Sequence, residues 1–218
     1  MFPLGDDDTQ RRSAPVVTVV LISLNLLVFF VELNGGEAFI QQWAFVPRRF
    51  GLDPSGQALT ILSAMFMHGG WMHLFGNMLY LWIFGDNVKD ALGKVKFLVF
   101  YLLCGMSATF AQYYVNPSSG VPNVGASGAI AGVLGAYLLM FPSSRVRVLV
   151  YNQIVAMPAF VVLGLWIVLQ AFSGIGSIAA TSQTADQGGV AYMAHVGGFV
   201  AGIVLAFVLR SRVIDERH

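Results

Sequence analysis

The sequence predicts an all-α membrane protein, a bundle of six transmembrane helices with a short fourth helix at its centre. Composition, apolar runs and the placement of basic residues support this fold class. Hydrophobic residues make up 56% of the 218-residue chain and charged residues 11%, whereas soluble domains carry about 25% charged residues. A water-soluble fold could not cover its surface with so few charges, so we expect the chain to be solvated by the lipid bilayer.

The apolar runs follow one another along the chain. They are residues 16–31, 71–88, 95–115, 127–141, 155–172 and 191–209. A helix needs about 20 residues to cross the hydrocarbon core, so several runs are short, and the fourth is the shortest. The first run is longer than the apolar region of a typical signal peptide, and we expect it to remain as the first membrane helix.

Basic residues fall almost entirely on one side of this predicted bundle. Ten of the twelve Lys and Arg residues precede the first run, follow the last, or separate the second from the third and the fourth from the fifth. Cytoplasmic connections are enriched in Lys and Arg, so we expect both termini in the cytoplasm. Residues 1–14 are predicted to be a disordered cytoplasmic tail, residues 15–210 the membrane domain, and residues 211–218 a second cytoplasmic tail.

The connection between the first and second runs is the longest and is predicted to lie outside. It spans residues 32–68 and contains aromatic and aliphatic side chains together with Arg48 and Arg49. An outer loop this apolar is expected to lie partly in the membrane interface. It would act either as a packed cap over the bundle or as an element that governs substrate access.

Several classes of function are disfavoured by composition. The chain has no basic run or basic-aromatic patch that would indicate a nucleic-acid partner. Its single cysteine, Cys104, excludes an intramolecular disulfide and a Cys-rich metal site. No paired, interrupted helices of the kind found in inverted-repeat transporters are visible in its two halves.

Three polar side chains are predicted to lie at one depth in the membrane. Counted from the basic side at about 1.5 Å per residue, His73, Ser127 and His195 each lie roughly 22 to 24 Å into their helices, and Asn77 is one turn from His73. Ionisable groups at such depth are costly and usually functional. A shared depth is what a site assembled from three helices requires.

The segment before the fourth run cannot be helical, because residues 116–123 contain two prolines and a glycine. Irregular backbone at membrane depth is tolerated only inside protein or beside a water-filled cavity. We therefore expect the fourth helix to begin partway into the membrane, at the floor of a cavity. Ser127 would lie at its N-terminus, where backbone N–H groups have no helical partner.

Small residues recur four apart directly after Ser127 and His195. Gly128 and Gly132 form one pair, and Gly198 and Gly202 form the other. Small residues at this spacing let membrane helices approach closely. The two pairs therefore predict that the fourth and sixth helices bring Ser127 and His195 within side-chain reach.

Serine and histidine at one site indicate nucleophilic catalysis. A serine hydroxyl needs a base to take its proton, and histidine titrates near neutrality. The backbone N–H of Ser127, together with His73 and Asn77, are candidates to bind a tetrahedral oxyanion. Alternatives stay open: Ser127 as a packing residue, Asp186 as a third catalytic member, or a metal bound by three histidines, with His68 as the third.

Three ordered motifs resemble the rhomboid family of intramembrane serine proteases. Residues 125–128 read GASG, residues 68–77 follow the pattern H-x4-H-x3-N, and residues 194–198 follow AHxxG. They fall on the second, fourth and sixth predicted helices, as in that family. The resemblance covers roughly residues 15–210.

The resemblance implies roles for particular residues. Ser127 would be the nucleophile and His195 the general base. His73, Asn77 and the Ser127 N–H would stabilise the oxyanion. His68 and Gly128 would support the site.

It also implies that no cofactor or metal takes part. The substrates would be single-span or other membrane proteins, cut near the outer end of a transmembrane segment. The predicted location is a multi-pass position in the prokaryotic plasma (inner) membrane. The oligomeric state and the physiological substrate are not predicted.

Two positions depart from the family pattern. Many members carry an aromatic residue four positions after the nucleophile, which stacks on the catalytic histidine, whereas this chain has Ala131. Some members carry a Trp-Arg pair in the first outer loop, whereas here Trp43 is followed by Ala44. The packing around His195 must therefore come from another residue.

Two other functions compete with a protease. A catalytically silent rhomboid-like protein would bind membrane clients without cutting them, but such relatives commonly lack the serine or the histidine, and this chain has both. A channel or transporter would use the polar residues as a conduction path, which the scarcity of carboxylates within the apolar runs disfavours.

Overall fold

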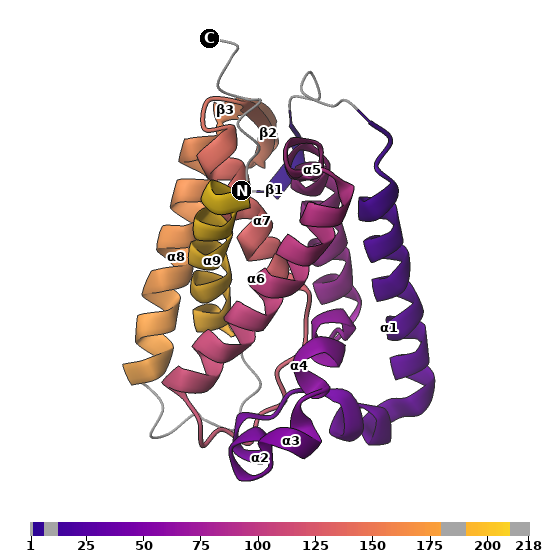
Figure 1. The fold of residues 1–218 in the computed structure, drawn as a ribbon. Helices are drawn as coiled ribbons and strands as arrows, with labels where there is room; N and C mark the ends of the chain where they lie inside the picture. The colour runs from indigo at the N-terminus through magenta and orange to yellow at the C-terminus, as the bar shows by residue number, and fades with distance from the viewer. Residues whose placement is uncertain (1, 7–12, 180–190, 210–218) are drawn as a thin grey trace.

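The computed structural model describes residues 2–6, 13–179 and 191–209, and these are largely helical. Three helices are long and apolar enough to cross a membrane: α1 (Val16–Trp43), α6 (Lys94–Val115) and α9 (Tyr192–Leu209). A further apolar helix, α7 (Ser127–Met140), and the more polar α5 (Trp71–Leu92) lie among them, and the apolar helix α8 (Ala159–Ala179) lies at the edge of the bundle beside α9 (Figure 1).

The helices largely coincide with the predicted apolar runs, but α1, α5 and α8 continue past the predicted ends at residues 31, 88 and 172. Helix α1 continues past residue 31 to Trp43, across a kink where Gly36 has a φ of 57° that favours glycine. The fifth predicted run was wrong at its start, because residues 155–158 belong to strand β3 (Gln153–Pro158). Pro158 restricts the residue before it to extended backbone, so α8 begins only at Ala159.

Helix α7 forms the centre of the molecule. It contacts α5, α6, α8 and α9, and its side chains are buried continuously from Gly128 to Tyr137. A helix that is apolar and buried on all sides belongs to a core. Its 14 residues agree with the short central helix predicted from the sequence.

A three-stranded antiparallel sheet caps one end of the helices, where the expectation of a purely α fold does not hold. Strand β1 (Phe2–Gly5) pairs with β2 (Arg145–Val150), which pairs with β3. Val146 and Val148 point inward from β2 and are fully buried. Residues 2–5, which were predicted to be part of a disordered tail, therefore form a strand that pairs with β2.

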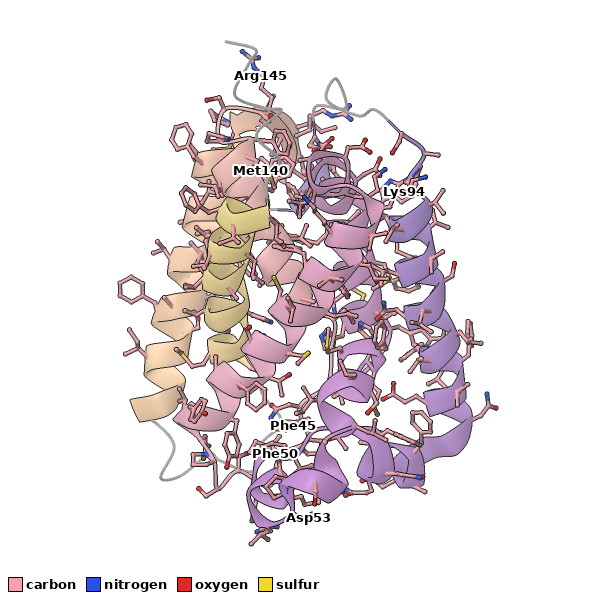
Figure 2. The ribbon with its side chains drawn as sticks, viewed as in Figure 1. Phe45, Phe50, Asp53, Lys94, Met140 and Arg145 are labelled. Carbon is pink, nitrogen blue, oxygen red and sulfur yellow. The ribbon has the colours of Figure 1, made fainter. Side chains whose placement is uncertain are left out.

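We call this end the basic end, because Lys94 and Arg145 lie there (Figure 2). The Lys89 side chain is completely buried, and its Nζ lies 2.7 Å from Asp86 and 2.9 Å from Asp90. The same Nζ donates to the carbonyl of Ala14 at 3.0 Å. These contacts tie the chain before α1 to the end of α5.

The opposite end is closed by the connection from α1 to α5. It contains α2 (Pro47–Leu52), α3 (Pro54–Gln57), α4 (Thr60–Ser63) and the 3-10 turn η2 (Ala64–Phe66). Phe45 is buried, with its ring 5.4 Å from that of Phe50, and its carbonyl accepts a hydrogen bond of 2.7 Å from the Asn123 N–H. This connection forms a packed cap, and Figure 2 shows Phe45, Phe50 and Asp53 at the end opposite Arg145.

Candidate active site

Ser127 is the first residue of α7, and the chain reaches it through non-helical backbone. Gly125 has a φ of 134°, a value that favours glycine, and its N–H donates to the carbonyl of Ala64 at 2.9 Å. No side chain caps α7, and the first backbone bond into it runs from Ile130 N–H to the Ala126 carbonyl. The N–H groups of the first turn, including that of Ser127, therefore have no partner within the helix.

Backbone contact between α7 and α9 brings the two predicted motifs together. A Cβ atom added at Gly198 would overlap the carbonyl of Gly128, and one added at Gly202 would overlap the carbonyl of Gly132. The glycines four residues apart thus let α7 and α9 approach closely, as the sequence predicted. Helix α9 is held at a distance at which a histidine side chain reaches across to α7.

The side chains of His195 and Ser127 meet at this contact. The Nε2 atom of His195 lies 2.8 Å from the Oγ atom of Ser127, a normal hydrogen-bond distance. His195 is largely buried, with 8% of its surface exposed. The geometry matches what a serine nucleophile and its base require.

Two residues of α8 also contact His195, and sequence reasoning missed both. The Nδ1 atom of His195 lies 2.6 Å from Oε1 of Gln170. The Trp166 ring lies against the imidazole, with centroids 5.8 Å apart and planes tilted by 35°. Trp166 occupies the packing role that Ala131 leaves open. The available signal was an uncharged amide one turn from a tryptophan inside an apolar run.

Helix α5 contributes His73 and Asn77 from one face. A Cβ atom at Gly125 would lie 2.9 Å from Nε2 of His73, so the imidazole lies directly against the backbone that leads to Ser127. Asn77 is 8% exposed, and within the described chain its Nδ2 has no hydrogen-bond partner. A buried amide donor without a partner is unusual in a native protein and is available to a ligand.

These side chains line a single cavity of about 1100 Å³. Ser127, His195, His73, Asn77 and Gln170 all form part of its wall, together with Gly128. A cavity of this size with few convergent polar groups is typical of a ligand or active site.

His68 lies behind this wall rather than in it. Its ring centroid is 5.1 Å from that of His73, and both ring nitrogens are buried without a partner among the described residues. Its backbone N–H donates to the buried carboxylate of Glu32 at 2.9 Å. His68 therefore packs against His73 and is not part of the cavity wall that contains Ser127.

Two alternatives from the sequence bear on this site. Asp186 lies outside the described residues. In the part of the chain that is described, no three His, Cys, Asp or Glu side chains gather as metal ligands.

Comparison with known proteins places this chain in a family. The family model for the rhomboid domain matches residues 55–212. The rhomboid protease GluP of Bacillus subtilis (strain 168) is 31% identical over 201 residues, which are 91% of this chain and 36% of that protein. YdcA of the same organism is 28% identical over 200 residues, covering 92% of this chain and 91% of that protein.

Eukaryotic relatives also match. Rhomboid protein 1, mitochondrial, of Saccharomyces cerevisiae (strain ATCC 204508 / S288c) is 27% identical over 203 residues, which are 91% of this chain and 54% of that protein. The chain thus spans about a third of GluP and about half of the yeast protein. Together with its apolar helices, these matches identify the chain as a multi-pass integral membrane protein that belongs to the rhomboid family.

Proposed function

We propose that this protein is an intramembrane serine endopeptidase that cleaves transmembrane segments of membrane proteins through a Ser127–His195 dyad. The distance of 2.8 Å between His195 Nε2 and Ser127 Oγ, at the wall of a large cavity, carries the proposal. The name of one relative, rhomboid protease GluP, supports the same activity.

In the first step, His195 Nε2 takes the hydroxyl proton as Ser127 Oγ attacks the carbonyl carbon of the scissile peptide bond. The carbonyl oxygen becomes a tetrahedral oxyanion, for which the Ser127 N–H, the Asn77 amide and His73 are the donors. His195 then gives the proton to the leaving amine, and the peptide C–N bond breaks. Water, activated by His195, hydrolyses the acyl-serine ester and restores the hydroxyl group.

The cavity geometry favours this reaction over a silent client-binding function. A binder needs neither a base 2.8 Å from the serine nor an unpartnered amide donor beside it. Both features are what acyl transfer uses.

The test is cleavage of a model single-span substrate, and labelling by a serine-reactive phosphonate, using purified protein in detergent. We expect wild type to cleave and to label, and Ser127→Ala and His195→Ala to do neither while staying folded. Ser173→Ala is a matched control, since Ser173 is an exposed serine of α8, and it should behave as wild type.

Cleavage by Ser127→Ala would refute the dyad. Failure of the wild-type protein to label with the phosphonate would favour the silent client binder, because labelling needs only an activated serine and no correct substrate.

We further propose that the basic end faces the cytoplasm of a prokaryotic cell, with both termini on that side. The concentration of Lys and Arg in the connections at this end supports this orientation. Cysteines introduced on the hairpin at Tyr151, which is 96% exposed, should react with a membrane-impermeant reagent only after the cells are permeabilised. Reaction in intact cells would reverse the orientation.

A further inference from the structure

We propose that Gln170 is a positioning residue of the catalytic dyad, which fixes His195 in the tautomer able to act as a base. The proposal rests on the proposed protease function and adds a residue that belongs to none of the three sequence motifs. Its basis is the contact of 2.6 Å between Gln170 Oε1 and His195 Nδ1.

A neutral imidazole carries one proton, and its location decides whether the ring can act as a base. His195 can accept the Ser127 proton only if Nε2 has a free lone pair, which requires the ring proton to be on Nδ1. The Gln170 carbonyl oxygen is an acceptor only, so it stabilises the Nδ1–H form. The opposite amide orientation would turn the NH2 group toward Nδ1 and favour the unproductive tautomer.

The same contact assists the reaction once the proton has moved. When Nε2 takes the serine proton, the ring becomes a cation whose Nδ1–H still donates to Gln170. Hydrogen bonds to charged groups are stronger than neutral ones, so the contact strengthens as the reaction proceeds. An amide provides this acceptor without burying a carboxylate in a segment surrounded by hydrocarbon, where a charge is costly.

The position of Gln170 is fixed by its helix. Trp166 is one turn earlier on the same face of α8 and lies against both His195 and Phe199, with ring centroids 5.8 Å and 6.3 Å apart respectively. The Trp166 ring and the Gln170 amide, both on α8, thus contact the His195 imidazole together. Leu169, the residue before Gln170, is 55% exposed and faces away from this contact.

The test compares two substitutions of nearly the same shape. Gln170→Met keeps the length of the side chain but removes the oxygen acceptor, and Gln170→Glu keeps an oxygen acceptor in either protonation state. We expect Gln170→Met to lower kcat and the rate of phosphonate labelling about 10- to 100-fold, with KM nearly unchanged. Gln170→Glu should recover most of the labelling rate, and Leu169→Met should match wild type.

A second measurement does not depend on activity. The chain has four histidines, so nitrogen NMR of histidine-labelled protein can resolve the His195 ring. Wild type should show the proton on Nδ1, and Gln170→Met should show a mixture of tautomers.

Labelling of Gln170→Met at the wild-type rate, or an unchanged tautomer in that variant, would overturn the positioning role and leave the dyad intact. If wild type itself fails to label while the tautomer still responds to Gln170→Met, the protease function fails and the orientation by Gln170 stands.

Discussion

Helix α9 packs against α6, α7 and α8, and its contacts with α7 and α8 differ in kind. Against α7 it meets backbone with backbone, because glycines such as Gly198 and Gly202 leave no side chain between the helices. Against α8 it meets side chains, including Trp166 and Gln170 around His195. The first contact sets the separation of the two helices, and the second sets the orientation of one side chain.

The largest expected effect is at the backbone contact. In Gly202→Ala the new Cβ atom would overlap the Gly132 carbonyl, and forced overpacking of this kind typically destabilises by about 1–3 kcal/mol or more. We expect a lower unfolding temperature in detergent and loss of phosphonate labelling.

Gly164→Ala is the matched control on α8, because a Cβ atom there would meet nothing within 4 Å. Alanine also has the higher helix propensity, so this variant should be as stable as wild type or more so. Equal behaviour of the two alanine variants would mean that α7 and α9 are not in backbone contact.

A smaller effect is expected at Asn77, one of the side chains that α5 contributes to the cavity wall. Asn77→Ala removes an amide donor that has no partner among the described residues, so the fold should survive. Loss of one oxyanion donor lowers the rate about 100- to 1000-fold. We expect kcat to fall with little change in KM, and a change confined to KM would argue against an oxyanion role. Phe75→Leu, an exposed position on the same helix, should leave both constants unchanged.

The smallest effect is expected at the aromatic contact between α8 and α9. Trp166→Ala removes the ring that lies 5.8 Å from His195, and aromatic contacts are worth about 0.5–1.5 kcal/mol. Labelling should therefore slow by up to about tenfold, whereas Leu165→Ala, at an exposed position of α8, should have no effect.

The double variant Trp166→Ala, Gln170→Met then tests whether the two side chains act on the same ring. Because they share one partner, their effects should be less than additive. Full additivity would indicate that Trp166 stabilises α8 rather than orienting His195.

The contact between α7 and α9 could be predicted from the sequence, whereas the contact of Gln170 with His195 could not. Glycines at a spacing of four, and a serine and histidine at equal depth, are local patterns with few meanings in a membrane helix. They predicted the meeting of α7 and α9. Gln170 gave no such signal, because an uncharged amide in an apolar run is compatible with many roles.

The sheet at the basic end was missed for a different reason. Residues 145–150 alternate between exposed and buried positions, which is a strand pattern visible in the sequence. Its pairing with β3 is a local hairpin, but its other partner, β1, lies more than a hundred residues earlier, and pairing over such a separation cannot be read from local periodicity. The buried contact from Tyr137 OH to Asp6, at 2.7 Å, depends on that pairing.

The volume of the cavity has a consequence for the supply of the second reactant. Hydrolysis consumes one water molecule per bond, and hydrocarbon contains almost none. At about 30 Å³ per molecule in the liquid, a space of about 1100 Å³ has room for roughly 35 water molecules. Under the proposed mechanism, water held in this cavity could reach the ester on Ser127 without crossing the lipid.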